Sequence, residues 1–205
     1  MSFNEETLSD QVVNALSELG NIGAGNAATS LASMTSSRLT VSPPTVELLS
    51  FDSLAEKLGG AETNVVGILS AFEGDLSAMI LFVTDLENAA SIVEAVAGKE
   101  LDWRTEIGLS AIKEVGNILI GSYVASLQAL LNKKLRYVQP EICIDMAGAI
   151  LDIPCIEIGK VSDHTLLINS KFNNGEKELE GYLMVFSDAH SYDRLLSDLG
   201  VSLDA

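Results

Sequence analysis

The stretch ELGNIGAGNAATSLA, residues 18–32, combines an acidic residue, an amide and three glycines within an apolar spacing typical of a helix. Such glycines could form a loop that cradles a phosphate, or they could clear space on a helix that another molecule approaches closely. The local string is G-x-x-G-x-G, which differs from both nucleotide-binding glycine motifs, and no lysine accompanies it. We therefore favour a helix surface shaped for close approach.

This stretch has a second copy, EVGNILIGSYVASLQ, which begins at Glu114. At about 100° per residue, the face opposite the apolar stripe carries the same pattern in both copies. The outward residues are Asn14, Glu18, Asn21 and Gly25 in the first copy and Ser110, Glu114, Asn117 and Gly121 in the second. One Glu and Asn pair on an exposed helix face would be ordinary surface. Two symmetric copies favour a surface selected for contact or chemistry.

The opposite face of each helix is expected to be buried. The predicted core positions are Val12, Leu16, Leu19, Gly23, Ala27, Leu31 and Met34 in the first copy, and Ile112, Val115, Leu119, Tyr123, Leu127 and Leu130 in the second. Gly20 and Gly116 lie toward this buried side, where a missing side chain lets another element pack closely.

Periodicity and turn residues predict the elements that position these helices. Helices are expected near 6–37, 86–97, 104–133 and 189–199, and strands near 44–51, 63–73, 77–84, 138–148, 154–161, 164–172 and 179–187. Hairpin-like succession of the strands predicts a mixed α/β fold with a largely antiparallel sheet covered by helices. AMILFVTDLENAASIVEAVAG resembles GYLMVFSDAHSYDRLLSDLG, so we expect one internally duplicated domain with halves of about 1–100 and 101–205.

Composition narrows the classes of function. The net charge of −17, from 29 acidic and 12 basic residues, would repel nucleic acid and anionic lipid. A secretory leader and a membrane-spanning run are not expected, and the chain is expected to be cytoplasmic. Cys143 and Cys155, in strand-like apolar contexts, are interpreted as small buried side chains, while His164 and His190 lack ligand spacing. We expect no cofactor or metal site of the chain's own.

The repeated pattern resembles the CheC chemotaxis phosphatases, a family that also includes CheX and FliY. The family signature is Asp or Ser, three residues, Glu, two residues, Asn, twenty-two residues and Pro. The second copy matches it at Ser110, Glu114, Asn117 and Pro140. The first copy matches at Glu18, Asn21 and Pro44, with Asn14 in place of Asp or Ser. Two complete Glu and Asn pairs without further domains indicate the CheC branch.

The resemblance implies hydrolysis of the aspartyl phosphate of the response regulator CheY. Asn21 or Asn117 would hold the attacking water in line, and Glu18 or Glu114 would pair with a lysine of the regulator. Asn14, Gly25, Ser110 and Gly121 are candidate partner contacts, and the magnesium ion would belong to the regulator. The resemblance also implies binding of CheD, a receptor deamidase, so an adaptor role is the alternative. Two sites in one chain are compatible with a monomer.

Overall fold

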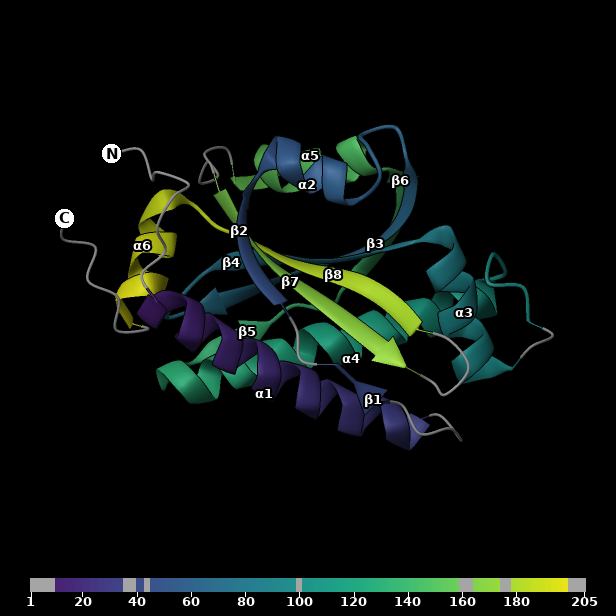
Figure 1. The fold of residues 1–205 in the computed structure, drawn as a ribbon, viewed down its shortest axis with the longest axis horizontal. Helices are drawn as coiled ribbons and strands as arrows, with labels where there is room; N and C mark the ends of the chain where they lie inside the picture. Colours follow the sequence, from purple (N-terminus) through teal and green to yellow (C-terminus); the bar gives the residue numbers. More distant parts are fainter. Residues whose placement is uncertain are drawn as a thin grey trace.

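The computed structural model describes residues 10–34, 40–42, 45–98, 101–158, 164–173 and 178–198. In chain order the elements are α1 (Asp10–Met34), β1 (Thr40–Val41), β2 (Thr45–Ser50), α2 (Phe51–Lys57), β3 (Asn64–Gly74), β4 (Ala78–Asp85), α3 (Leu86–Ala97), α4 (Glu106–Leu131), β5 (Leu135–Tyr137), β6 (Glu141–Met146), α5 (Ala147–Ile158), β7 (His164–Asn173), β8 (Glu178–Phe186) and α6 (Ala189–Asp198). They form three layers, with α1 and α4 on one side of a central sheet and α2 and α5 on the other (Figure 1).

The sheet is antiparallel throughout, as the hairpin pattern predicts. Its strand order is β1-β7-β8-β4-β3-β5, with β2 also paired to β7 and β6 also paired to β3. Strands β1 and β2 therefore pair with a strand from the C-terminal half of the chain, while β5 and β6 pair with one from the N-terminal half. The order of elements is α-β-β-α-β-β-α in both halves. That order agrees with the expected duplication. The duplication itself and the boundaries of the two halves stay predictions.

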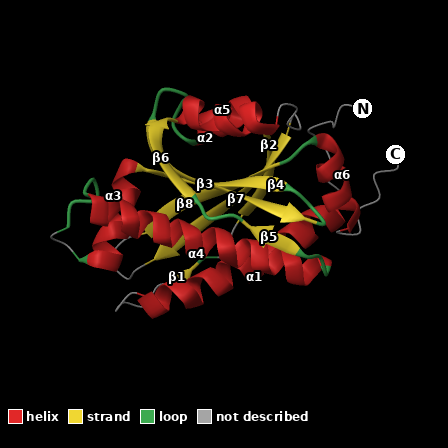
Figure 2. Ribbon diagram, turned by 180° about the vertical axis from the view of Figure 1, so that it is seen from behind, coloured by secondary structure: helices red, strands yellow, loops and turns green. Residues whose placement is uncertain are grey.

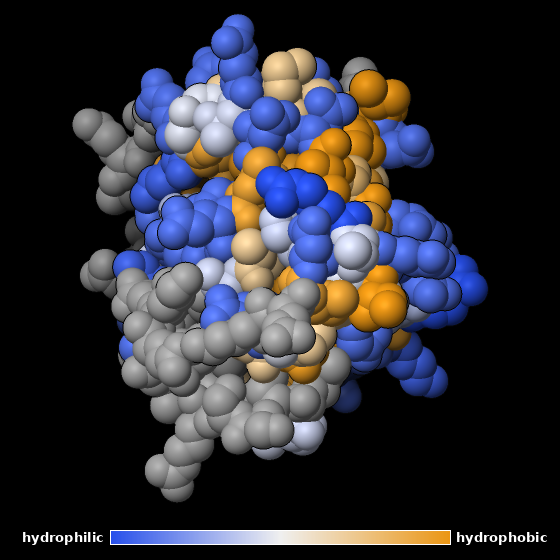
Figure 3. Space-filling model, turned by 90° about the vertical axis from the view of Figure 1, so that its right-hand side faces the viewer, coloured by the Kyte–Doolittle hydropathy of each residue, from blue (hydrophilic) through white to orange (hydrophobic). Residues whose placement is uncertain are grey.

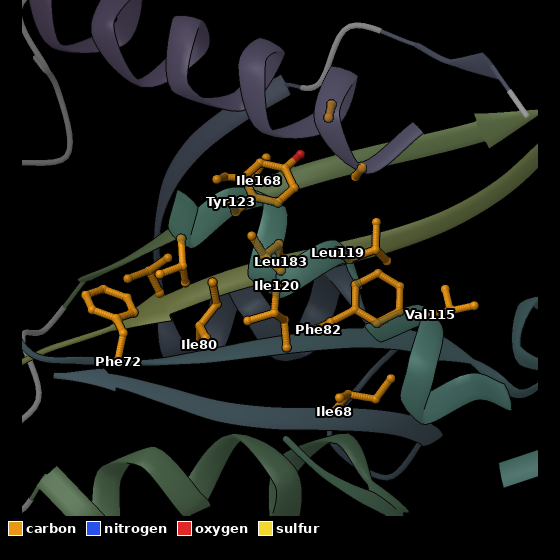
Figure 4. Close-up of a cluster of buried hydrophobic side chains, with 14 of the residues drawn as sticks. Ile68, Phe72, Ile80, Phe82, Val115, Leu119, Ile120, Tyr123, Ile168 and Leu183 are labelled. Carbon is orange, nitrogen blue, oxygen red and sulfur yellow. The ribbon is translucent and has the colours of Figure 1, made fainter. Parts of the chain in front are cut away.

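Helices α1 and α4 run side by side beneath the sheet (Figure 2), and buried glycines let them pack closely. A Cβ added at Gly23 of α1 would lie 2.5 Å from Cδ1 of Tyr123 on α4. Tyr123 lies directly under α1 in the core (Figure 4). A Cβ at Gly116 would overlap Ile68 of β3. These two glycines are needed for packing inside the chain, as expected for Gly116.

The predicted core face of the two helices is largely confirmed. Leu19, Ala27 and Leu31 of α1 are buried, as are the predicted residues of α4 from Ile112 to Leu127. Leu130 is a wrong prediction: its side chain is 38% exposed, and the neighbouring Leu131 is buried at the end of the helix instead. The side chains of Val12, Leu16 and Met34, and Pro44 as a whole, lie outside the described residues.

The strand predicted at 154–161 is wrong, because residues 147–158 form helix α5. Its buried residues are Ala147, Ile150, Leu151 and Pro154, whose spacing is helical. Cys155 therefore lies on a helix, while Cys143 lies on strand β6 as predicted. The short elements α2, β1 and β5 were not expected; α2 is capped by Ser50, whose side chain accepts a hydrogen bond from the Ser53 backbone N–H.

Helix α4 is long and apolar enough to cross a bilayer by length and composition alone. In this fold its apolar side chains pack against α1, α3 and the sheet. The length and hydropathy of α4 are therefore accounted for by its place in the core.

Candidate functional site on helices α1 and α4

Helix α4 carries the second-copy residues, and both of its ends are capped. Thr105 caps the start, accepting a hydrogen bond from the Gly108 backbone N–H at 3.1 Å, and Asn132 ends the helix in the left-handed conformation. With the apolar face buried against the sheet, Ser110 and Glu114 are exposed. Asn117 and Gly121 follow on the same face and are half-buried. The structure thus places the predicted second-copy residues in one row along the outside of α4.

The first copy lies on α1 with the same spacing. Its four predicted residues, Asn14, Glu18, Asn21 and Gly25, are all exposed. Helices α1 and α4 run in opposite directions (Figure 1), and the Asn26 side-chain amide of α1 donates a hydrogen bond to the Ser126 hydroxyl of α4 at 3.3 Å. The structure brings each set together on its own helix, so there are two separate candidate sites.

Gly25 and Gly121 differ from the buried glycines of the same helices. A Cβ added at either would meet no atom within 4 Å, so packing within the described chain does not require these glycines. Each mid-helix glycine costs about 0.5–1 kcal/mol relative to alanine. Each lies one turn beyond the asparagine of its site and leaves open space beside it.

Hydrogen bonds link the two polar residues of the second site to a third residue. The Tyr137 hydroxyl donates to Oδ1 of Asn117 at 2.7 Å. The amide of Asn117 then donates to Oε2 of Glu114 at 3.5 Å, one turn earlier on the helix. Tyr137 was absent from the sequence prediction. Its contact with Asn117 depends on strand β5 lying beside helix α4, which local sequence patterns do not predict. Tyr137 lies three residues before Pro140, which is buried. That position was only a weak sequence signal that Tyr137 belongs to the site.

The protonation of Tyr137 follows from its surroundings. Burial raises the pKa of its hydroxyl, a hydrogen bond with Ser70 lowers that pKa, and the charge of Glu114 raises it. The net effect is a raised pKa, so the hydroxyl remains protonated near neutral pH and acts as the donor to Asn117.

The Glu114 carboxylate is available to a cation from outside. The neighbouring Lys113 is turned toward Glu141, with 2.9 Å between its Nζ and Oε2 of that residue. Across the part of the chain that the structure describes, Glu114 forms no salt bridge. An exposed carboxylate beside an oriented amide can therefore bind a basic group and place a polar hydrogen-bonding group next to it.

The cysteines, the histidines and possible metal ligands were the other residues considered for chemistry. Among the described residues, no group of three or more His, Cys, Asp or Glu side chains is arranged to hold a metal ion. Cys143 and Cys155 are free and half-buried, and burial is the main cause that raises the pKa of each thiol. His164 begins β7 and His190 lies on α6.

Comparison with known proteins gives three findings. The sequence model of the CheC-like family matches residues 12–48 and 107–137, the segments that contain most of the two helices. The chain is 30% identical over 204 residues to a Bacillus subtilis protein named CheY-P phosphatase CheC, covering 96% of this chain and 97% of that protein. The fold is similar to that of crystalline Thermotoga maritima FliY, with a TM-score of 0.72, 20% identity, and coverage of 95% and 98%.

A further solved structure with a similar fold is a complex of CheX with CheY, BeF₃ and Mg²⁺ from Borrelia burgdorferi. The TM-score is 0.51 at 16% identity, covering 81% of this chain and 96% of that chain.

Proposed function

The chain belongs to the CheC-like family, and we propose that it is a phosphatase that hydrolyses the aspartyl phosphate of the chemotaxis response regulator CheY. The observation that carries the proposal is the row of Glu, Asn and open Gly that recurs on the exposed faces of α1 and α4. The Bacillus subtilis relative named CheY-P phosphatase CheC supports it, since the match extends over nearly the whole of both chains.

The reaction needs a water molecule in line with the bond that breaks. An aspartyl phosphate is a mixed anhydride, so water attacks phosphorus, the P–O bond to the aspartate carboxyl breaks, and the products are aspartate and inorganic phosphate. Phosphoryl transfer passes through a loose transition state, in which positioning matters more than a strong base. The amide of Asn21 or Asn117 is suited to that task, since it both donates and accepts hydrogen bonds.

The acidic residue and the glycine of each site have docking roles in this proposal. Glu18 or Glu114 pairs with a lysine of the regulator, and the open space at Gly25 or Gly121 admits the regulator's backbone near its phosphorylated aspartate. Asn14 and Ser110 extend each contact by one helical turn. An exposed ion pair is worth only up to about 1 kcal/mol, so the pairing mainly sets orientation and specificity.

The charge of the departing phosphoryl group must be neutralised by other groups. We assign this role to the magnesium ion and a lysine of the regulator, so that this chain supplies only the amide and the carboxylate. We further propose that the reaction takes place in the cytoplasm and that a monomer with two sites performs it.

The test is catalytic turnover with CheY-P in excess. The proposal expects inorganic phosphate to be released faster than by CheY-P alone, in many equivalents per chain and in proportion to the amount of this protein. If the folded protein is present and phosphate is still released only at the intrinsic rate of CheY-P, the phosphatase function is refuted.

A second candidate function is binding of the receptor deamidase CheD, and exposed apolar side chains outside the two rows of candidate residues favour it. Ile144 and Met146 of β6 and Ile156 of α5 are large, exposed apolar side chains, and Ile156 is 76% exposed. Figure 3 shows apolar side chains in a band at the end of the molecule that carries α3 and β6. Helix α5 lies on the opposite side of the sheet from α1 and α4, so a partner there would leave both candidate sites open.

This adaptor role is tested with purified CheD. Ile156→Glu is expected to weaken CheD binding while CheY-P hydrolysis is retained. Ile107→Glu is the matched control, since it changes a similarly exposed isoleucine, 67% exposed, at the start of α4. Equal CheD binding by both variants would contradict an interface on α5.

A further inference from the structure

We propose that Tyr137 is a positioning residue of the second site, where it fixes the side-chain amide of Asn117, and that the two sites of the chain are therefore unequal. This inference rests on the proposed phosphatase function. It concerns which of the two sites is prepared for reaction before the regulator binds.

The Tyr137 hydroxyl is held from the sheet. Tyr137 ends strand β5, where it pairs with Phe72 of β3. The next residue, Val138, donates its backbone N–H to the Ala71 carbonyl at 2.9 Å, and its own carbonyl accepts a hydrogen bond from the buried Ser70 hydroxyl. Because the backbone on both sides of the ring is anchored to β3, the hydroxyl has a fixed position over α4.

Tyr137 and Glu114 together hold one orientation of the Asn117 amide. The terminal torsion of an asparagine is broad and roughly two-fold, so an unrestrained amide exchanges its oxygen and nitrogen positions. Oδ1 lies 2.7 Å from the Tyr137 hydroxyl and the amide nitrogen faces Glu114. The reversed amide would turn Oδ1 toward the Glu114 carboxylate, which can only accept hydrogen bonds, so that orientation is disfavoured. One lone pair of Oδ1 and one amide N–H stay available to a water molecule.

Within the described residues, the first site lacks this support. At the constant spacing that relates Asn21 to Asn117, the residue that corresponds to Tyr137 is Val41 on strand β1, which has no hydrogen-bonding side chain. Asn21 is exposed, and within the described ranges its side chain has no hydrogen-bond partner. Among the described residues, hydrogen bonds therefore hold the Asn117 amide before the regulator docks, and none holds the Asn21 amide.

Two further positions near the sites also differ between the two copies. Next to Tyr137, Val138 is an exposed apolar residue, and the corresponding residue of the first copy is Ser42. Ile107, one turn before Ser110, is 67% exposed, and its counterpart is Gln11. At these two positions the second copy has apolar residues where the sequence of the first copy has polar ones.

The experiment separates the sites with alanine variants of the two asparagines. Tyr137→Phe, which removes only the hydroxyl, is combined with Asn21→Ala, so that only the second site acts, and with Asn117→Ala, so that only the first site acts. In the Asn21→Ala protein, Tyr137→Phe is expected to lower kcat for CheY-P hydrolysis about 3- to 10-fold, the loss typical of one hydrogen bond, with KM unchanged. In the Asn117→Ala protein, kcat and KM are expected to stay the same.

The two backgrounds make each outcome decisive. An unchanged or increased kcat in the Asn21→Ala protein overturns the inference, as does an equal loss in both backgrounds, which would indicate a general effect on the fold. Failure of the proposed function is a different result: neither background would accelerate CheY-P decay even with Tyr137 present.

Discussion

Gly121 gives a prediction in which stability and activity change in opposite directions. It lies in the middle of α4, where an added Cβ meets nothing within 4 Å. Gly121→Ala therefore gains the helix propensity of alanine and restricts the unfolded chain without a clash. We expect the free energy of unfolding to rise by about 0.5–1 kcal/mol and Tm to rise by about 1–4 °C. Urea unfolding followed by circular dichroism measures the change.

Gly116→Ala is the matched control, five residues earlier on the same helix. Its propensity gain is the same, but its Cβ would overlap the Ile68 side chain in the core. Overpacking of this kind typically costs about 1–3 kcal/mol, so this variant is expected to lose stability. A loss of stability in Gly121→Ala similar to that in Gly116→Ala would refute the conclusion that the space at Gly121 is open.

Activity supplies the second part of this prediction. If the regulator approaches α4 at Gly121, a large side chain there blocks docking even though the chain itself stays folded. Gly121→Leu in the Asn21→Ala background, where only the second site acts, is expected to raise KM for CheY-P strongly. Normal hydrolysis by this double variant would contradict the docking role of the glycine.

Three further outcomes are expected. Gly23→Ala should lower the free energy of unfolding by about 1–3 kcal/mol in urea unfolding, because the added Cβ would lie 2.5 Å from Tyr123; unchanged stability would contradict the close crossing of α1 and α4. Glu114→Gln in the Asn21→Ala background should raise KM for CheY-P more than it lowers kcat, and a loss confined to kcat would argue against a docking role. Thr105→Ala should cost about 1 kcal/mol in thermal unfolding through loss of the bond from Gly108, and an unchanged Tm would mean that the cap is not needed.

The faces of the two long helices could be predicted because the apolar period of 3.6 residues continues over about seven turns. Leu130 marks the limit of that reasoning, because it is exposed at the last turn of α4 while the neighbouring Leu131 is buried. Helix α5 was missed because a short apolar run fits a strand and a helix equally well, although the burial of Ile150, Leu151 and Pro154 shows a helical spacing.

Contacts between distant parts of the chain could not be predicted from local patterns. The pairing of β2 with β7 and of β6 with β3 depends on sheet topology, which alternation of apolar residues does not encode. Tyr137 belongs to the same class, since its role depends on β5 lying beside α4. The Glu and Asn positions were proposed from the repeat itself, because the same residue types recur on the outward face of both predicted helices.

The most direct measurement is the decay of phosphorylated CheY in the presence of the wild-type chain, Asn21→Ala, Asn117→Ala and the double variant at equal concentrations of folded protein. Binding of each to CheY carrying BeF₃ and Mg²⁺ is measured in parallel. The account predicts that each single variant retains accelerated decay and that the double variant loses it while still binding the regulator. Accelerated decay by the double variant at the wild-type rate would contradict the claim that these two asparagines position the attacking water.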